Sequence, residues 1–391
     1  MSRDAPNILL LSEIFPPKHG GSGRWFFELY RRLTPGTVTL LTHRNNNDRE
    51  HSIDEAFPQT VVRVPMASAN WGVLSGEGLG FYGRMVRTIL KIKPRQLDQI
   101  HCGRTLPEGV MGLAVSRLLR KPLICYVHGE DIEVARTSRE LAMLVRWVLK
   151  GSKRLICNSQ NTRNLLIEHW QVPEPKITVL SPGVDTTTFT PAEQDARFRR
   201  KMGWEDAFVA LTVGRLQRRK GHDAMIEALP AIRETIPNIK YAIVGDGDQR
   251  PRLQALVKEH KLEQVVQFLD ELDDAQLVQC YQQCDFFILP NRADGNDIEG
   301  FGMVLVEAQA AGKPVIAGDS GGTAETMVQG DTGLIVDCTR PSAIQVGVVQ
   351  LFEAMQNGQF TPEACRNHVL DNLTWERHTA KAVNLFDEVS R

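Results

Sequence analysis

Two glutamates eight positions apart, Glu299 and Glu307, are the pair in this sequence whose spacing most directly suggests chemistry. The segment around them, residues 297–308, has the pattern of a glycine-containing loop that passes directly into a helix. One carboxylate then lies on the loop and the other inside the helix, so both could face one ligand. Between them, the first-turn amides of Met303, Val304 and Leu305 would have no acceptor within the helix and could seat a phosphate. Carboxylates can accept hydrogen bonds from hydroxyl groups, and amides can donate to a diphosphate. The two side by side would suit a nucleotide sugar.

A cationic pair stands earlier in the same half of the chain. Arg215 and Lys220 follow the predicted strand Phe208 to Val213, at the end where open α/β sheets carry function. A guanidinium and an ammonium there could grip a diphosphate and neutralise the charge that grows on it. We interpret the adjacent Arg218 and Arg219 as a solvated basic loop.

The second half contains further motifs in a recognisable order. They are Ser181-Pro182-Gly183-Val184-Asp185, Gly214-Arg215-Leu216 with Lys220-Gly221, Gly245-Asp246-Gly247, Glu299 to Glu307, Ala311-Gly312-Lys313-Pro314 and Gly321-Gly322. In order and spacing this set resembles the donor site of retaining glycosyltransferases of family 4, the group 1 class with the GT-B fold. Parts of it are similar to mannosyltransferases that act on inositol lipids.

The resemblance implies an α/β fold of GT-B architecture, in which two Rossmann-like, doubly wound domains face each other across a cleft. The expected domains are residues 1–182, which bind the acceptor, and residues 183–374, which bind the nucleotide sugar. A C-terminal helix, residues 375–391, is expected to cross back to the first domain. A proline and a glycine at 182 and 183 stop the pattern at this boundary.

The resemblance also implies roles for single residues. His128 would contact the donor sugar, Glu299 would lie near the transferred sugar and Glu307 on the ribose hydroxyls. We therefore predict catalytic roles for His128, Glu299, Arg215 and Lys220. Donor binding is predicted for Gly20, Gly21, Asp270, Phe301, Gly302, Met303, Val304, Leu305 and Glu307.

Some of these residues have weak support of their own. Gly20 and Gly21 follow the first strand and open a helix, where a plain turn would explain them about as well. Asp270 could accept from a guanine, which is the one hint of GDP over UDP. The segment from His101 to Arg104 could line an acceptor pocket.

The predicted reaction moves a hexose from a nucleotide diphosphate sugar to a hydroxyl of a glycan or lipid-linked acceptor, and the resemblance implies retention. GDP-mannose is preferred over UDP-glucose. The resemblance implies that neither a cofactor nor a metal is needed, and Asp246-Gly247-Asp248, which imitates the D-x-D of metal-dependent transferases, has the pattern of a glycine turn after a strand. Two alternatives are a sugar-nucleotide-binding homologue without catalysis and an NAD-dependent oxidoreductase. The second fits less well because Phe26 stands where the third glycine of G-x-G-x-x-G should be.

Composition and charge limit the class of protein to which this chain can belong. The chain has 391 residues, 42% hydrophobic and 24% charged, which is enough for two cores. We expect a cytoplasmic protein with buried free thiols at its seven scattered cysteines, and no nucleic-acid partner. Residues 1–182 carry 25 Lys and Arg against 16 Asp and Glu, a net of +9, while residues 183–391 have a net of −10. The basic half suggests an anionic acceptor or peripheral contact with the inner membrane surface, unless these charges are merely solvated.

Short apolar runs alternate with amphipathic segments, which is typical of parallel βα units. Two loops of the first half, residues 45–57 and 70–83, show no readable pattern. Predicted strands are Asn7 to Leu11, Val38 to Thr42, Val61 to Val64, Leu123 to Val127, Leu155 to Asn158, Ile177 to Leu180, Phe208 to Val213, Tyr241 to Val244, Val266 to Leu269, Phe286 to Leu289, Val315 to Ala317 and Leu334 to Val336. Predicted helices include Gly23 to Leu33, Pro107 to Leu119, Arg139 to Lys150, Ser159 to Trp170 and Trp375 to Arg391.

Overall fold

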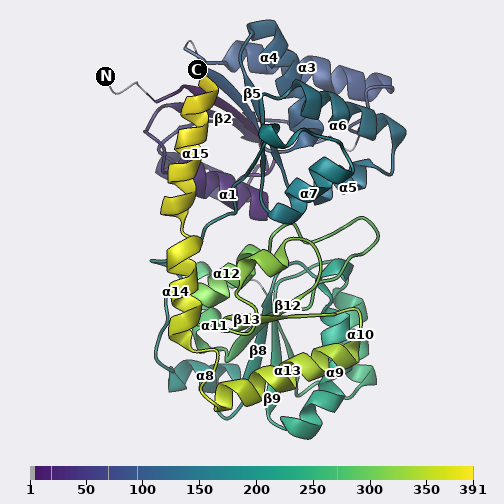
Figure 1. Ribbon diagram of the computed structural model, residues 1–391, viewed down its shortest axis with the longest axis vertical. Coiled ribbons are helices and arrows are strands. Elements are labelled where there is room, and N and C mark those ends of the chain that lie inside the picture. The colour runs from purple at the N-terminus through teal and green to yellow at the C-terminus, as the bar shows by residue number, and fades with distance from the viewer. Residues whose placement is uncertain (1–4, 19, 69, 95, 271, 391) are drawn as a thin grey trace. The chain divides into compact units, whose positions relative to one another are not determined.

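The computed structural model describes residues 5–18, 20–68, 70–94, 96–270 and 272–390 (Figure 1). Internal contacts divide the chain into two units, Met1–Pro182 with Trp375–Arg391, and Gly183–Thr374. Each unit is a parallel sheet with helices on both faces. None of the helices in the described part combines the length and the apolar character needed to cross a bilayer.

The first unit holds a seven-stranded parallel sheet in the order β3-β2-β1-β4-β5-β6-β7. The strand order therefore reverses direction between β1 and β4. Its strands are β1 (Ile8–Ser12), β2 (Val38–His43), β3 (Thr60–Val64), β4 (Gln99–Cys102), β5 (Leu123–Val127), β6 (Arg154–Cys157) and β7 (Ile177–Val179).

Helices cover both faces of this sheet. One layer has α3 beside α4 and α4 beside α6, and the other has α1 beside α15 (Figure 1). Burial on both sides explains why β5 and the first four residues of β1 are hydrophobic. The helical segments are α1 (Gly21–Tyr30), α2 (Arg49–Ala56), α3 (Gly76–Ile92), η1 (Thr105–Gly109), α4 (Val110–Leu119), α5 (Glu130–Ala135), α6 (Arg139–Gly151), α7 (Gln160–Glu168), η2 (Glu174–Lys176) and α15 (Trp375–Ser390).

The C-terminal helix α15 belongs to the first unit, as predicted. Trp25 of α1 donates its indole N–H to His378 of α15 at 2.9 Å, and the other ring nitrogen of His378 meets the Ser181 carbonyl at 2.8 Å. Near the far end of the helix, Lys153 donates to the Val389 carbonyl at 2.9 Å and the Gln99 amide donates to the Phe386 carbonyl. The Lys153 bond satisfies a carbonyl of the last turn, where no later turn of the helix supplies a donor, and the Gln99 bond adds to the one that the Ser390 hydroxyl makes to the Phe386 carbonyl.

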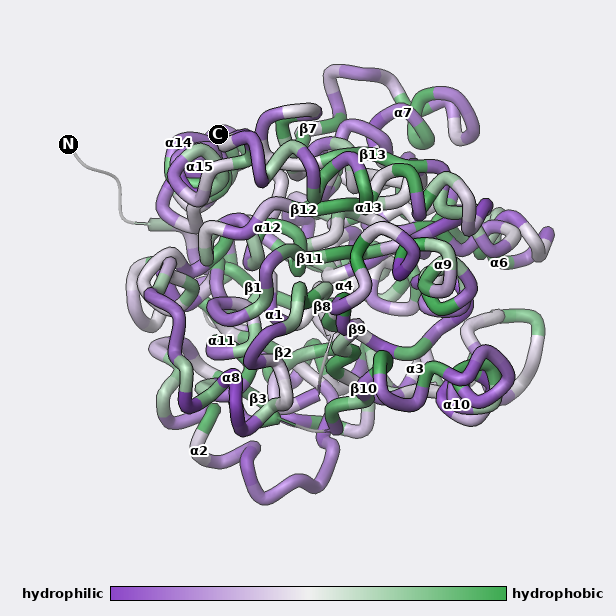
Figure 2. Tube along the Cα trace, turned by 90° about the horizontal axis from the view of Figure 1, so that it is seen from below, coloured by the Kyte–Doolittle hydropathy of each residue, from purple (hydrophilic) through white to green (hydrophobic). Residues whose placement is uncertain are grey.

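The second unit holds a six-stranded parallel sheet in the order β10-β9-β8-β11-β12-β13, which reverses between β8 and β11. Figure 2 shows hydrophobic residues along β11 and β12, both fully buried. Its strands are β8 (Phe208–Val213), β9 (Ile239–Val244), β10 (Val266–Leu269), β11 (Phe286–Leu289), β12 (Val315–Gly318) and β13 (Gly333–Val336). Its helical segments are α8 (Ala196–Met202), η3 (Arg218–Lys220), α9 (His222–Thr235), α10 (Arg250–Glu259), α11 (Asp274–Gln283), α12 (Met303–Ala310), η4 (Thr323–Thr326), α13 (Pro341–Gln356) and α14 (Pro362–Asn372).

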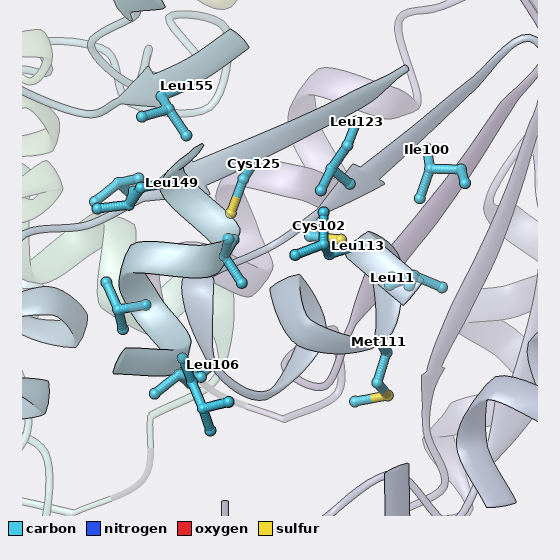
Figure 3. Close-up of a cluster of buried hydrophobic side chains, with 14 of the residues drawn as sticks. Leu11, Ile100, Cys102, Leu106, Met111, Leu113, Leu123, Cys125, Leu149 and Leu155 are labelled. Atoms are coloured by element: carbon cyan, nitrogen blue, oxygen red, sulfur yellow. The ribbon is translucent and has the colours of Figure 1, made fainter. Parts of the chain in front are cut away.

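The cores are built from strand side chains and the helices packed on them. Figure 3 shows part of the first core, where Cys102 and Cys125 lie among leucines from strands and helices. All seven cysteines are buried and free, which confirms the prediction of buried thiols. Burial raises the pKa of the Cys280 and Cys284 thiols to about 12.

The strand β4 and the helices α2, α3 and α5 have no counterpart among the elements predicted for the first unit. The strand β4 has only four residues and begins Gln99-Ile100-His101, so it lacks an apolar run. The helix α2 lies in the first patternless loop, and none of its residues is buried. The helix α3 begins in the second, where four glycines at 76, 78, 80 and 83 weaken the helical pattern. The predicted helix Pro107 to Leu119 is divided between η1 and α4.

Candidate active site

A buried ion cluster lies beyond the carboxyl ends of β8 and β11 in the second unit. Lys220 and Arg219 of η3 both donate to Oε2 of Glu299 at 2.5 Å. Arg219 also reaches Asp297 at 3.1 Å. The side chains of Lys220, Arg219 and Glu299 are only 10–12% exposed. This is the point of the sheet where the strand order reverses, the usual place for a ligand in an open α/β sheet.

The electrostatics of the cluster follow from these contacts. Burial alone would raise the pKa of Glu299, but Lys220 and Arg219 outweigh it and lower the pKa to about 2. The carboxylate is therefore ionised at neutral pH. Lys220 and Arg219 share one oxygen of Glu299 and Arg219 also pairs with Asp297, so two cations face two carboxylates and the cluster is electrically balanced.

Two close backbone contacts position the cluster. Gly221 has φ +69°, and a Cβ there would lie 1.7 Å from the Pro290 carbonyl oxygen. Gly321 has φ +72°, and a Cβ there would lie 1.8 Å from the carbonyl oxygen of Glu299. The Gly322 amide donates to that same oxygen at 3.0 Å. Glycine is required at both positions because the chain segments touch and the backbone is left-handed.

The helix α12 begins directly after this loop. Its N-cap is Gly302 at φ +92°, and no side chain caps it. Among the described residues, the amides of Met303 and Val304 have no intramolecular acceptor, in line with the predicted phosphate seat. The prediction was wrong for Leu305, whose amide donates to the Gly302 carbonyl at 2.9 Å because the first turn tightens.

Glu307 has a different partner from Glu299. It is 4% exposed, and its Oε2 accepts from the Tyr281 hydroxyl of α11 at 2.7 Å. Phe301 is also buried, in the hydrophobic core below α12, so only its backbone can serve a ligand. The ribose role of Glu307 stays a prediction.

The other predicted residues of the second unit lie nearer the surface. Arg215 is exposed in the loop after β8. The Asp270 side chain, just after β10, is 79% exposed and is paired with Arg250 of α10. Arg250 lies 5.5 Å over the Phe268 ring. A carboxylate and an aromatic residue thus lie at the same edge, at the end of β10.

The interpretation of Arg219 as a solvated residue is wrong, because its side chain is 12% exposed. For the adjacent Arg218, which is 63% exposed, the same interpretation is confirmed. Successive residues of a 3-10 helix point about 120° apart, so Arg219 faces inward while its neighbour faces water. The signal in the sequence was the pair of acidic residues Asp297 and Glu299, which need cationic partners if buried.

In the first unit, His128 directly follows β5 and is half-buried. Its Nε2 lies 2.7 Å from the Gly103 carbonyl, and its amide donates to Asp131 at 3.0 Å. Because a carbonyl only accepts, Nε2 carries the proton and Nδ1 is left as an acceptor in the neutral ring. Trp25 and Phe26 pack edge-on against the ring.

Gly20 is the N-cap of α1 and Gly21 its first residue, without a side-chain cap. The pair therefore opens a helix, as predicted. His101 does not line a pocket: it is fully buried between Tyr30 and Gln99, and burial lowers its pKa to about 3.

Comparison with known proteins gives the family. Residues 194–358 match the model of glycosyl transferases group 1, and residues 19–188 match that of glycosyltransferase family 4. The chain is 31% identical over 386 residues to a GDP-mannose-dependent alpha-(1-6)-phosphatidylinositol monomannoside mannosyltransferase of Mycolicibacterium smegmatis, covering 97% of both chains. This chain is a group 1, family 4 glycosyltransferase.

Another relative agrees with this glycosyltransferase class, and two similar solved structures of other proteins agree with the fold. A D-inositol 3-phosphate glycosyltransferase of Pseudarthrobacter chlorophenolicus is 29% identical over 340 residues, covering 81% of this chain and 78% of that one. The structure of Anabaena HepE with UDP and glucose has a TM-score of 0.81 at 20% identity, over 98% of this chain and 99% of the other. Sucrose-phosphate synthase from Thermosynechococcus elongatus has a TM-score of 0.77 at 21% identity, over 98% and 99%. The predicted fold class, GT-B with two Rossmann-like units, is confirmed.

Proposed function

We propose that this glycosyltransferase moves mannose from GDP-mannose to a hydroxyl of an inositol-bearing lipid or a related glycan, with retention at the anomeric carbon and without a metal. The observation that carries the proposal is the Lys220–Arg219–Glu299 cluster, followed by the uncapped start of α12. The names of the mycobacterial relatives, which cite GDP-mannose and phosphatidylinositol mannosides, support the choice of donor and acceptor.

The cluster supplies what departure of a nucleoside diphosphate requires. Negative charge grows on the leaving diphosphate as the glycosidic bond breaks, and Lys220 and Arg219 are already held in place to meet it. Glu299 keeps both cations aligned, and its ionised carboxylate can accept from a sugar hydroxyl. The amides of Met303 and Val304 add two donors for phosphate oxygens.

His128 has a matching role in this proposal. Its Nδ1 accepts from a hydroxyl of the donor sugar, while the bond from Nε2 to Gly103 fixes the ring. The uncapped helix start at Gly20 and Gly21 provides further amides for the donor in the first unit.

The nucleotide choice depends on Asp270. A guanine base offers its N1–H and its 2-amino group to one carboxylate, whereas uracil offers a single N–H. The side chain of Asp270 is exposed at the end of β10; Arg250 donates to its Oδ1, and Oδ2 together with the second lone pair of Oδ1 can accept from the base. This favours GDP over UDP.

The uneven distribution of charge along the chain supports an anionic lipid as the acceptor. Residues 1–182 have a net charge of +9 and residues 183–391 a net of −10. A basic first half is drawn to an anionic lipid surface, so we place the reaction in the cytoplasm at the inner face of the membrane.

Ligand-dependent stability tests the donor directly. GDP-mannose, UDP-glucose and NAD are each added to wild-type protein and to Lys220→Met, and unfolding is followed by a thermal shift. A ligand at 100 times its dissociation constant adds about 2.7 kcal/mol to stability. We expect GDP-mannose to stabilise the wild type and to lose most of this effect in Lys220→Met. Stabilisation by UDP-glucose or NAD alone would overturn the proposed donor.

Turnover tests the reaction. Transfer from radiolabelled GDP-mannose to phosphatidylinositol in detergent should fall by about 10² to 10³ in Lys220→Met, the scale for loss of one charge-stabilising contact. Arg218→Met is the control, because that side chain is 63% exposed and its loss should leave the rate nearly unchanged. NMR of the product's anomeric proton reports retention or inversion.

A further inference from the structure

A second charged cluster lies in the first unit, beyond the carboxyl ends of β1 and β4. Glu13 directly follows β1, and Arg104 comes two residues after the end of β4. The strand order of this sheet reverses between these two strands, which makes their carboxyl ends the expected place for a ligand. The proposed donor site uses the equivalent place in the second unit and gives these residues no role.

The cluster is held together by Arg104. Its Nε donates to both carboxylate oxygens of Glu108, at 3.0 and 3.2 Å, and its Nη2 donates to Glu13 at 2.5 Å. The other oxygen of Glu13 accepts from Lys18 at 3.0 Å. Glu108 is 1% exposed and also accepts from the Glu13 amide at 2.8 Å. The guanidinium is thus fixed on two sides by buried carboxylates.

A tryptophan lies against the same guanidinium. The Arg104 carbon Cζ is 5.2 Å from the centre of the Trp71 ring. The loop that carries Trp71 is itself fixed, because the Tyr82 hydroxyl donates to the Trp71 carbonyl at 2.8 Å and the Leu74 amide donates to Glu140 at 2.7 Å. Residues of the three helical segments α3, η1 and α6 therefore fix this arrangement beyond the carboxyl ends of β1 and β4.

Two partly exposed donors in this cluster have capacity for a ligand, and a third donor, beside them, is buried without an acceptor from the residues that the structure describes. Among the described residues, Nη1 of Arg104 has no protein acceptor, and the side chain is 18% exposed. The Lys18 side chain is 37% exposed and makes one ion pair. The indole N–H of Trp71 is buried without a partner in the described part of the chain. A buried donor without an acceptor is destabilising, and an oxygen from a bound ligand would satisfy it.

Charge decides what kind of ligand fits. Arg104 and Lys18 are faced by Glu13, Glu108 and Asp131, and Asp131 accepts from the Thr105 amide at 3.2 Å. Two cations against three carboxylates leave a net of −1, so a phosphate gains no net attraction here. A ring bearing several hydroxyls does fit, because each hydroxyl can donate to a carboxylate and accept from an N–H.

We infer that Lys18, Arg104 and Trp71 form a subsite for the neutral, polyhydroxylated ring that carries the accepting hydroxyl. Glu108 acts as a positioning residue, because it aligns the guanidinium without facing solvent. The identity of this ring as the acceptor rests on the proposed function. Its binding to the first unit does not.

Direct binding tests the subsite. Saturation-transfer NMR is recorded for methyl α-D-mannopyranoside, myo-inositol and myo-inositol 1-phosphate, with wild type, Lys18→Met, Arg104→Lys and Trp71→Phe. We expect the two neutral rings to bind the wild type and to bind each variant about ten-fold more weakly. Lys91→Met is the matched control, since Lys91 is exposed on α3 in the same unit. It should leave affinity within about two-fold.

The outcomes separate the subsite from the donor proposal. Failure of both neutral rings to bind wild type, binding of the phosphate compound alone, or unchanged affinity in all three variants would each overturn the subsite. Lys18→Met changes a partly exposed side chain, so it remains informative if Arg104→Lys is unstable. GDP-mannose is titrated in parallel against Lys220→Met. If this variant loses donor binding but still binds the neutral rings, the result confirms the donor site of the second unit and leaves the subsite of the first unit intact. Absence of GDP-mannose binding in wild type would refute the donor while the ring measurements still decide the subsite.

Discussion

The acid stability of this protein should report the buried pair between Glu299 and its two cations. Lys220 and Arg219 lower the pKa of Glu299 from 4.5 to about 2, and its side chain is only 12% exposed. A shift of that size corresponds to about 3.4 kcal/mol of folding free energy at neutral pH. Because the folded pKa lies below the unfolded one, this stabilisation is complete above pH 4.5 and is lost as the pH falls toward 2. At pH 3 about 1.4 kcal/mol remains, so about 2 kcal/mol disappears between pH 7 and pH 3.

Glu299→Gln removes the titrating group and should therefore remove this part of the pH dependence. Urea unfolding of wild type and variant at a series of pH values gives the difference in unfolding free energy at each. We expect that difference to shrink by about 2 kcal/mol from pH 7 to pH 3. Glu263→Gln, an exposed glutamate of the same unit, is the control and should differ from wild type by no more than about 0.5 kcal/mol throughout. A wild-type minus Glu299→Gln difference that stays constant across this range would show that the ion pair is not formed in solution.

Three further predictions follow from local packing. Gly221→Ala should destabilise the protein by several kcal/mol in urea unfolding, because its Cβ would lie 1.7 Å from the Pro290 carbonyl oxygen. Gly36→Ala is the control: Gly36 also has a positive φ, but its Cβ would have no atom within 4 Å, so this change should cost only about 1 kcal/mol. Tyr281→Phe should lower the unfolding free energy by about 1.5–3 kcal/mol, because buried Glu307 loses a donor, and an unchanged urea midpoint would contradict that bond. The seven cysteines should react with a thiol reagent only as fast as the protein unfolds, since all are buried; rapid labelling of native protein would contradict this.

The sequence was sufficient for the fold class because the strands of the second unit are predominantly apolar, and all six were predicted within two residues. It was insufficient where burial comes from neighbours rather than from local pattern. The strand β4 is held by β1 and β5 on either side, and its own residues give no such signal.

The same distinction applies to the candidate site. The start of α12 and the glycine turns were readable, because helix starts and left-handed turns depend on adjacent residues. The contact of Lys220 with Glu299 joins residues 79 positions apart, and nothing local specifies it. The inward direction of Arg219 depends on the 3-10 geometry of η3, which three basic residues in a row do not reveal.

The return of α15 to the first unit affects the order in which a nascent chain can fold. Residues 183–374 form one complete unit and leave the ribosome before residues 375–390 do. Until α15 arrives, the Trp25 indole N–H, the Gln99 side-chain amide and the Lys153 ammonium lack the acceptors that α15 supplies, and α1 covers its side of the first sheet without its neighbouring helix. The unit that is synthesised first is therefore completed last, and during translation its unprotected surface is the one available to chaperones and proteases.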